Sequence, residues 1–259
     1  GALDLGPAVV DATKMAGSNA ITQAEGTTVN VTSGAISSAT DAIVANGTST
    51  VNLSSGTTVT AGVGSALYRV TSGTGTLNAT SVELTGLLQA QGAGSQLALH
   101  LAGGSVYTGT PSVVNGATAS LSTDATSTWN ATGDAALTGL DNQGTIVFAD
   151  AAATGQGVGR AAMKAAQTSE PTYHAITVDG NYTGGGTVKM RTDLSNIATA
   201  GNPNTDRLLI SGSASGQTTL SRKRCHRGTC VHRRAHVDAR HLARAGRRVR
   251  QCEFVQAGG

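Results

Sequence analysis

The most regular feature of the chain is an alternation of apolar and polar residues over short stretches that recur along the sequence. Apolar side chains alternate with Thr, Asn or Ser in TTVNVTSG (27–34), STVNLSSG (49–56), GTLNATSVELTG (75–86) and SQLALHLAGG (95–104). Weaker copies follow at TASLSTD (118–124) and GTIVFAD (144–150). A period of two residues predicts strands that bury one face, and the Gly- and Ser-rich stretches between them predict turns.

These predicted strands recur at a nearly constant distance. The spacing between starts is 22 residues from Thr27 to Ser49 and 20 residues from Gly75 to Ser95. A repeat of this length is typical of solenoids, and it provides room for two or three short strands with their turns. Parallel stacking of such units buries a narrow aliphatic column and pairs the backbone of each coil with the next. The pattern therefore predicts an all-β fold, a parallel β-solenoid.

The composition fits thin, repetitive β-structure. The chain is 39% hydrophobic, 13% charged and 3% aromatic, and it contains 35 glycines. Ordinary domains carry about 25% charged residues, so this chain has little material for a polar active site or a thick aromatic core. The recurring Val, Ile and Thr distinguish it from a disordered Gly- and Ser-rich linker.

Two stretches fall outside the repeat. Residues 1–26 read as an irregular lead-in with one weak strand around Val9 and Val10. Residues 151–172 contain a helix-like run from Gly159 to Gln167, which Pro171 stops. We expect this second segment to be an excursion from the rod.

The stretch from Tyr173 to Leu220 reads as short strands separated by turns. Apolar residues alternate with polar ones at 176–178, 188–192 and 208–210, and glycine-containing turns are predicted at 179–180, 183–186 and 211–212. Two sequences in this stretch are specific: G-N-Y-T-G-x-G-T at 180–187 and T-D-R-L-L-I-S-G-x-A-S-G-x-T at 205–218.

This stretch resembles the C-terminal passenger region of pertactin-like bacterial autotransporters, the segment often called the autochaperone or junction region. Residues 129–149 have the spacing W-x-x-x-G-x-x-x-L-x-x-L-x-x-x-G-x-I-x-F and resemble the passenger segment that precedes it in the same family. Trp129 and Phe148 are among the few large apolar residues in the chain, and we expect both in the core.

The resemblance implies a right-handed parallel β-helix with passenger coils at 1–128 and the pertactin-like region at 129–220. Residues 221–259 form a separate basic tail, where the resemblance ends. The terminal unit would act as a template, because a stable final coil offers preceding coils an edge to pair with. We expect its stability to depend on Trp129, Gly133, Phe148, Asn181, Tyr182, Gly184, Val188, Asp206, Leu208 and Ile210.

The function implied by the resemblance is display at the bacterial cell surface or outer membrane, or secretion, as a virulence-associated adhesin without catalysis. The implied partners are an outer-membrane β-barrel translocator, which this chain lacks, and a host-cell receptor. No run of about 20 apolar residues is present, so no transmembrane helix is predicted. The chain starts at Gly1 without an initiator Met, and we expect a processed chain or a fragment.

Motifs for nucleophilic catalysis are missing from the sequence. It contains no G-D-S-G, G-D-S-L or G-x-S-x-G. His100 alternates with Leu99 and Leu101, so it is predicted to face outward, and His174 lies in no recognisable Ser/Asp arrangement. We therefore predict no catalytic residue, no cofactor and no metal. The alternative is the stalk of a passenger enzyme, a protease or esterase, whose catalytic part lies upstream of Gly1.

Asparagine recurs in a pattern that also matches a glycosylation signal. The triplet N-x-[ST] occurs at Asn30, Asn46, Asn52, Asn78, Asn130 and Asn181. Because Asn suits the turns of β-coils, we interpret these residues as structural.

The charge of the chain changes abruptly at Ser221. Residues 1–220 hold 7 basic and 13 acidic residues (net −6), whereas residues 221–259 hold 11 basic and 2 acidic ones (net +9) and all three cysteines. We expect this basic tail to be irregular or disordered.

Three interpretations of the tail compete. Its Arg and Lys suit a polyanion-binding arm, and Cys225, Cys230, His232 and His236 suggest a metal site, although the spacing lacks the gap of about 12 residues in a zinc finger. The third interpretation is a shifted reading frame, in which GC-rich alanine codons become arginine and glycine codons. We favour the third and do not expect nucleic acid as a partner.

Overall fold

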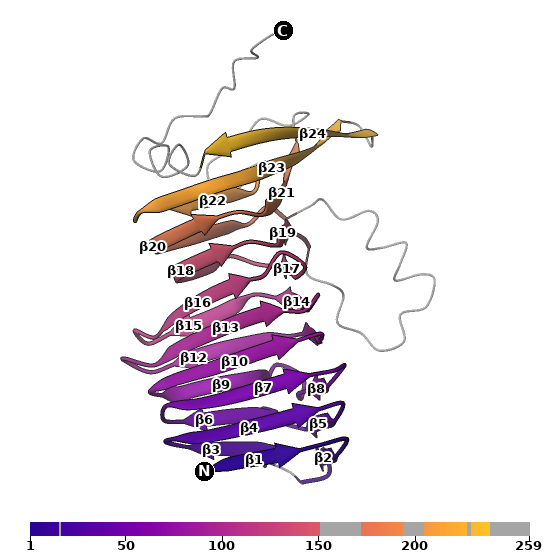
Figure 1. The fold of residues 1–259 in the computed structure, drawn as a ribbon, viewed down its shortest axis with the longest axis vertical. Helices are drawn as coiled ribbons and strands as arrows, with labels where there is room; N and C mark the ends of the chain where they lie inside the picture. The colour runs from indigo at the N-terminus through magenta and orange to yellow at the C-terminus, as the bar shows by residue number, and fades with distance from the viewer. Residues whose placement is uncertain (16, 151–171, 194–204, 227–228, 239–259) are drawn as a thin grey trace, which may run out of the picture.

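The computed structural model describes residues 1–15, 17–150, 172–193, 205–226 and 229–238, with side chains for all of these but residue 193 and residues 223–238. All regular structure in the described residues is strand, and the strands stack into a rod that rises coil by coil from the N-terminus (Figure 1). The predicted all-β solenoid is confirmed. The helix-like run from Gly159 to Gln167 lies outside the described residues.

Each coil in the N-terminal part of the rod contributes three strands. The first strands are β1 (Ala2–Leu5), β4 (Thr27–Thr32), β7 (Ser49–Ser54), β10 (Thr74–Thr80), β13 (Gln96–Ala102) and β16 (Thr118–Thr123). The second strands are β2 (Val9–Ala12), β5 (Ala35–Ser38), β8 (Thr58–Thr60), β11 (Glu83–Thr85), β14 (Val106–Gly109) and β17 (Thr128–Ala131). The third strands are β3 (Ile21–Ala24), β6 (Ile43–Asn46), β9 (Ala66–Ser72), β12 (Leu87–Gln91) and β15 (Pro111–Val114).

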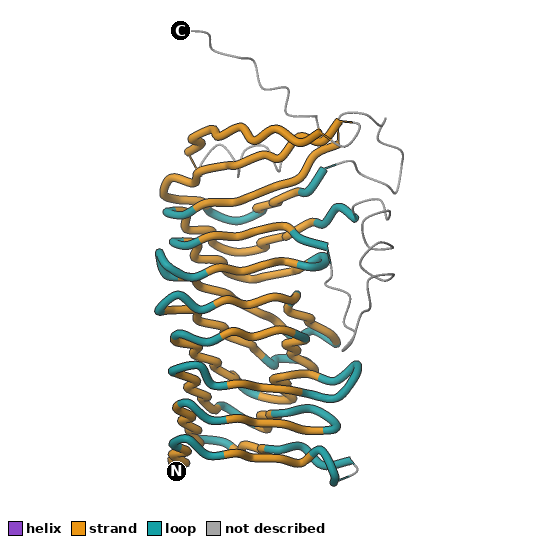
Figure 2. The backbone as a smooth tube through the Cα atoms, turned by 90° about the vertical axis from the view of Figure 1, so that its right-hand side faces the viewer, coloured by secondary structure: helices purple, strands orange, loops and turns teal. Residues whose placement is uncertain are grey.

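Each strand pairs with the equivalent strand of the neighbouring coil. The pairings on these three faces are parallel, and the coils turn with a right hand in Figure 1, as crossovers between parallel strands almost always do. Figure 2 shows the same stack from the side, with short loops at its corners.

The first coil is more regular than the sequence predicts. Residues 1–26 are expected to be a lead-in with one weak strand, but they form β1, β2 and β3, which pair with β4, β5 and β6. The strand around Val9 and Val10 is β2. The prediction failed because the two additional strands are four residues each, too short for alternation to stand out.

The parallel register stacks equivalent side chains into inward rows. On the first face, Leu3 begins the row with 47% of its surface exposed, and every later member is at most 3% exposed. The later members are Val29, Val51, Leu77, Leu99, Leu121, Leu140 and Tyr182. Because one row supplies a side chain to every coil, the core is a continuous thin column.

A second inward row contains two large aromatic residues, Tyr107 and Trp129. It runs through Leu84, Tyr107, Trp129, Ile146, Val188 and Leu220. The Trp129 side chain is fully buried, and its Nε1 donates a hydrogen bond to the carbonyl oxygen of Gly109 at 3.0 Å. Phe148, at the end of β19 (Thr145–Phe148), is 2% exposed. The prediction that Trp129 and Phe148 belong to the core is confirmed.

The outward face of the same strands carries a ladder of asparagines. Asn52 Nδ2 donates to Asn30 Oδ1 at 2.6 Å, and Asn78 Nδ2 donates to Asn52 Oδ1 at 2.7 Å. His100 follows in the same row, exposed as predicted, with Nδ1 2.6 Å from Ser122 Oγ. The amide nitrogens of Asn52 and Asn78, which a glycan would modify, are thus engaged in the ladder. This supports a structural role for these two asparagines, although they lie within strands and not in the turns that the sequence suggested.

The cross-section changes at β18 (Ala135–Asn142) and β20 (Ala175–Gly184), which each take the place of two strands. The start of β18 contacts β15, and its end pairs with β16. The pairing of β18 with β20 shifts register between Leu137 and Gly139. At this bend a Cβ on Gly180 would lie 1.9 Å from the carbonyl oxygen of Thr138, so the close approach requires glycine.

The last coils close the rod with strands of both directions. β22 (Arg207–Ile210) pairs with the first half of β20, and β23 (Ala214–His226) pairs with its second half and then with β21 (Thr187–Asp193). β24 (Thr229–Asp238) pairs antiparallel with β23. In Figure 1 β24 lies at the C-terminal end of the stack.

The abrupt change of composition at Ser221 is not a break in the strand. β23 continues through it, so the expectation of an irregular tail differs from the structure over residues 221–226 and 229–238, and residues 239–259 lie outside the described residues. Arg222 and Arg224 stand in register with Met190, which packs against the core, and Thr192, which is buried. In the preceding coil, these two register positions hold side chains that face inward; in the tail, the same two positions hold arginines.

One turn between coils depends on a carboxylate. Asp124 accepts hydrogen bonds from the backbone N–H groups of Thr126 and Ser127 in its own turn at 3.0 and 2.9 Å, and from Gly103 in the preceding coil at 2.8 Å. Burial raises the pKa of the Asp124 carboxyl, but the hydrogen bonds from Ser127, Gly103 and Thr126 together outweigh it and lower the pKa to about 2.

We predict that Asp124→Asn lowers stability at neutral pH by about 1 kcal/mol. The folded pKa of about 2 lies below the ordinary value of 3.8, so the carboxylate stabilises the fold above that ordinary value and this stabilisation disappears as the pH falls toward 2. Urea unfolding at several pH values measures the difference in free energy of unfolding between wild type and variant. This difference should become smaller as the pH falls from about 3.8 toward 2. A difference in free energy of unfolding that is constant with pH would contradict the stabilising role of the Asp124 carboxylate. The control is Asp141→Asn, which changes an exposed carboxylate on β18.

Candidate functional site in the terminal coils

The residues predicted to stabilise the terminal unit differ in their placement. Trp129, Phe148, Tyr182, Val188, Asp206 and Ile210 are at most 2% exposed. Gly184 is buried, Leu208 is half-buried against the core, and Gly133 is half-buried in a turn. Asn181 differs from the rest because it is exposed on β20.

The two stretches that carry the family resemblance are neighbours in the structure. β18, within residues 129–149, pairs with β20, and β19 pairs with β21, although residues 151–171 separate the two stretches in sequence. Both therefore belong to one set of adjacent coils near the C-terminal end of the rod (Figure 1).

Gly184 leaves space for a polar side chain inside the rod. A Cβ on Gly184 would lie 2.1 Å from Thr218 Oγ1, and this hydroxyl is 2.8 Å from the Tyr182 hydroxyl. Burial raises the pKa of Tyr182, and the hydrogen bond with Thr218 opposes part of that rise. The glycine thus allows two buried hydroxyls to satisfy each other, as buried polar groups require.

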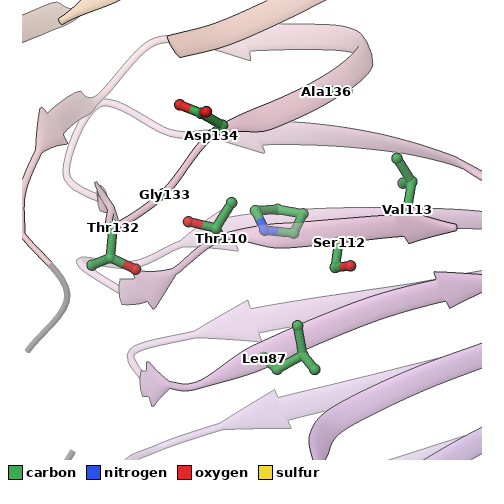
Figure 3. Close-up of a pocket in the computed structure, with 9 residues that line it drawn as sticks. Leu87, Thr110, Ser112, Val113, Thr132, Gly133, Asp134 and Ala136 are labelled. Atoms are coloured by element: carbon green, nitrogen blue, oxygen red, sulfur yellow. The ribbon is translucent and has the colours of Figure 1, made fainter. Parts of the chain in front are cut away.

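An open cleft lies beside these coils, where the third face changes from β15 to β18. Its volume is about 480 Å³, and its polar lining comes from Thr110, Ser112, Thr132 and Asp134 (Figure 3). Gly133 forms part of the wall between the last two of these residues.

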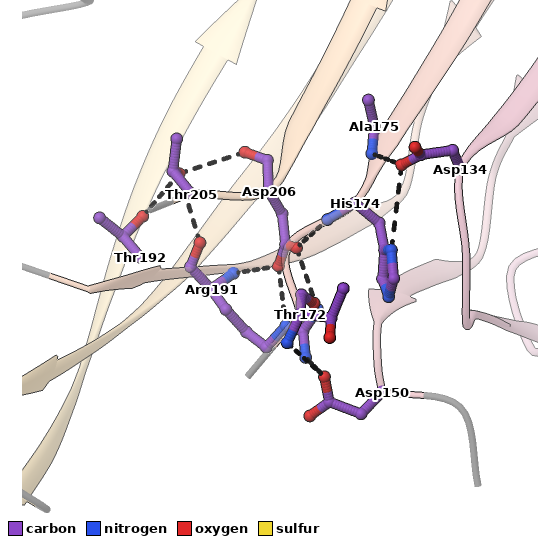
Figure 4. A network of polar contacts seen from close by, with 9 residues as sticks. All are labelled: Asp134, Asp150, Thr172, His174, Ala175, Arg191, Thr192, Thr205 and Asp206. Carbon is purple, nitrogen blue, oxygen red and sulfur yellow. Dashed lines mark hydrogen bonds and ion pairs between the residues drawn. The ribbon is translucent and has the colours of Figure 1, made fainter. Parts of the chain in front are cut away.

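A polar network centred on Asp206 joins the last coils (Figure 4). The buried carboxylate of Asp206 accepts hydrogen bonds from the backbone N–H of His174 at 2.9 Å and that of Arg191 at 2.7 Å. It also accepts from the Arg191 guanidinium, through Nε at 2.9 Å and Nη2 at 3.0 Å. Four donors therefore surround one carboxylate, which offsets the cost of removing its charge from water.

Arg191 connects this carboxylate to residues on both sides of the 151–171 segment. Its Nη1 donates to Asp150 Oδ1 at 2.7 Å, and its Nη2 donates to the carbonyl oxygen of Thr172 at 2.6 Å. The guanidinium also lies 5.7 Å from the centroid of the Tyr173 ring. Burial lowers the pKa of Arg191, but its hydrogen bonds with Asp206 and Asp150 and their charges outweigh this effect and raise the pKa.

His174 extends the network toward the cleft. Its Nδ1 lies 3.9 Å from Asp134 Oδ1, and the same oxygen accepts a hydrogen bond from the backbone N–H of Ala175 at 2.7 Å. The His174 side chain is 10% exposed, and its Nε2 is buried without a hydrogen-bond partner among the described residues.

Sequence reasoning found one member of this network and missed its partners. Asp206 belongs to a recognisable motif, but Arg191 lies 15 residues from it and Asp150 lies 41 residues from Arg191. No spacing rule for strands or turns connects residues so far apart, and only the stacking of coils brings them together.

Within the described side chains, no group of three or more His, Cys, Asp and Glu residues is arranged to hold a metal ion. The side chains of Cys225, Cys230, His232 and His236 lie outside that set, so the metal-site interpretation of the tail stays a hypothesis. In the described part of the chain, no helix has the length and apolar character to cross a membrane.

Comparison of the chain with models of protein families, with curated proteins and with solved structures found no match. The class that the structure defines is a parallel β-solenoid. Its distinguishing features are the terminal coils built on bent strands, the network around Asp206 and the antiparallel strand β24.

We predict that Asp206→Asn lowers the free energy of unfolding of the terminal coils by on the order of 3 kcal/mol, because it leaves a largely buried arginine without its main counter-charge. Urea unfolding and protease resistance of the full chain measure the loss. Asp179→Asn removes an exposed carboxylate from β20 and should change stability by less than about 0.5 kcal/mol. Equal effects of the two substitutions would show that the network contributes nothing specific.

Proposed function

We propose that the chain is part of the passenger of a bacterial autotransporter, displayed at the cell surface or secreted, with a structural and adhesive role. The observation that carries this proposal is the pairing of the two stretches that resemble the family. They occupy adjacent coils and supply the largest buried side chains of that region, among them Trp129 and Tyr182.

The solenoid architecture supports a role in display. A stack of thin coils is long relative to its width (Figure 1), and each short loop at a corner is a position where surface groups vary without disturbing the core. Val63, in the loop between β8 and β9, is fully exposed and shows that the rod tolerates an apolar residue projecting from a corner.

We propose no catalytic role for the described coils. His100 Nδ1 lies 2.6 Å from Ser122 Oγ, as a base lies beside a nucleophile, and sequence reasoning missed this pair because the two residues are one coil apart. The pair lies exposed on a sheet face within the asparagine ladder, away from the cleft. A passenger enzyme whose catalytic part precedes Gly1 is the second candidate function, and a G-D-S-G or G-D-S-L motif upstream would favour it.

The terminal coils would serve as a template for folding. β20 offers hydrogen-bonding groups to β18 on one side and to β22 and β23 on the other. β24 covers the outer edge of β23, so this end presents fewer unpaired strand edges than a simple stack would. A coil held on both sides provides the fixed edge against which preceding coils pair.

We predict that Leu208→Asp exposes the terminal coils to protease and slows refolding of the full chain, with a loss on the order of 3 kcal/mol, because it buries a charge against the core. The matched control is Leu209→Asp, since Leu209 is the neighbouring residue and is 38% exposed. Limited proteolysis during refolding measures the protease resistance and the refolding rate of each variant. Unchanged resistance and refolding in Leu208→Asp would contradict the template role.

We also predict that the passenger reaches the outside of the cell. An epitope inserted at the fully exposed Val63, in the complete gene expressed in a Gram-negative bacterium, should be labelled by antibody on intact cells or recovered from the medium. A periplasmic protein with the same epitope is the control and should be labelled only after lysis. Labelling of the passenger only after lysis would contradict surface display.

A further inference from the structure

The cleft between β15 and β18 has the dimensions of a small-molecule site. Its volume of about 480 Å³ falls within the range of roughly 300–1,000 Å³ that is usual for ligand pockets. The cleft lies where β15, the last separate strand of the third face, is followed by β18, which takes the place of two strands. The cleft is a result of this change in cross-section. Apolar contact surface comes from Leu87, Pro111 and Ala136.

Gly133 lies in a turn, but glycine is needed there for the space in the cleft and not for the backbone conformation of the turn. Its φ is not positive, unlike that of fourteen other glycines in the described chain, so its backbone conformation does not require glycine. A Cβ at this position would lie 3.1 Å from Thr110 Oγ1, within the cleft. The lack of a side chain at Gly133 therefore preserves space next to the Thr110 hydroxyl.

The polar groups of the cleft have unused hydrogen-bonding capacity. Thr110 Oγ1 is buried and has no hydrogen-bond partner among the residues that the structure describes. Asp134 uses Oδ1 for the backbone N–H of Ala175, and its Oδ2 makes no hydrogen bond with the described residues, while 78% of its side chain is exposed. In Figure 3, Thr110 lies between Thr132 and Ser112, with Asp134 above them.

The charges of the lining restrict the class of ligand. Among the described residues, no Lys or Arg lines the cleft, so these residues offer an anion no counter-charge. Asp134 is the single carboxylate that they contribute, whereas a Ca²⁺ site needs about six to eight oxygen ligands. A neutral molecule can donate hydrogen bonds to Asp134, exchange them with Thr110, and present an apolar face to Pro111.

We propose that this cleft binds one ring of a neutral saccharide. Sugar hydroxyls both donate and accept hydrogen bonds, which matches a carboxylate beside threonine and serine hydroxyls. The C–H face of the ring contacts Pro111 and Ala136. This binding is independent of the surface display proposed above, because it rests only on the residues that line the cleft, which come from three successive coils.

The test uses the full chain and a panel of free neutral sugars: hexoses, pentoses, 6-deoxyhexoses and N-acetylhexosamines at millimolar concentration. Saturation-transfer NMR detects binding, and titration gives the dissociation constant. Thr110→Val retains the shape and removes the hydroxyl, and Gly133→Ala fills the space. Each should weaken binding about tenfold. Thr76→Val, on the first face and away from the cleft, should leave it unchanged.

Saturable binding of at least one neutral sugar, weakened by both cleft variants and not by Thr76→Val, supports the proposal. No saturable binding across the panel overturns it. Binding that Thr110→Val and Gly133→Ala leave unchanged also overturns it, because the sugar then binds elsewhere. Thermal unfolding of each variant shows whether it is folded; if a variant is not, Asp134→Asn at the exposed rim takes its place, with the same expected weakening.

Discussion

Backbone hydrogen bonding between successive coils is the constraint on which the rest of this structure depends. Each coil must place its strands in register with the coil below, at a spacing of about 4.8 Å, so a residue's environment is set largely by its equivalent one coil earlier. This explains why Val29, Val51 and Leu77 share one inward row and why asparagines share one outward row. Variation is possible mainly where the cross-section itself changes.

The change of cross-section at β18 and β20 concentrates the chemically distinctive groups of the molecule. Upstream, the inward row of the first face is aliphatic, and this face has little charge. From β18 onward the interior contains the Tyr182–Thr218 hydroxyl pair, and the corner contains Asp206 and Arg191. The cleft at Gly133 opens at the same level. Within the regular stack, Arg69 forms a similar cross-coil contact with Asp41 and Gln91, but the change of cross-section brings several such polar groups together at one level of the rod.

The repeat could be predicted from sequence because each coil carries its own signal, alternation over about six residues followed by glycine or serine. The exposure of His100 followed from the same rule, and the burial of Trp129 followed from its large apolar side chain. The predicted turn at 179–180 is instead a bend within β20, since glycine marks both features. The Asp206 network and the partner of Gly133 in the cleft could not be predicted, because Arg191 and Thr110 meet them only through stacking. Arg222 stands in register with Met190, which packs against the core; an arginine at such a position conflicts with the local pattern of the fold and supports the shifted-reading-frame interpretation.

The network around Arg191 has a mechanical consequence. Under tension along the rod, the hydrogen bonds between coils lie parallel to the pull, so the coils are loaded in series and peel apart one at a time. Arg191 binds Asp150, Thr172 and Asp206 together and so fastens several segments of the terminal coils at one point. A force that opens one of these coils must also break the contacts of Arg191, so these coils resist separation more than they would with backbone hydrogen bonds alone.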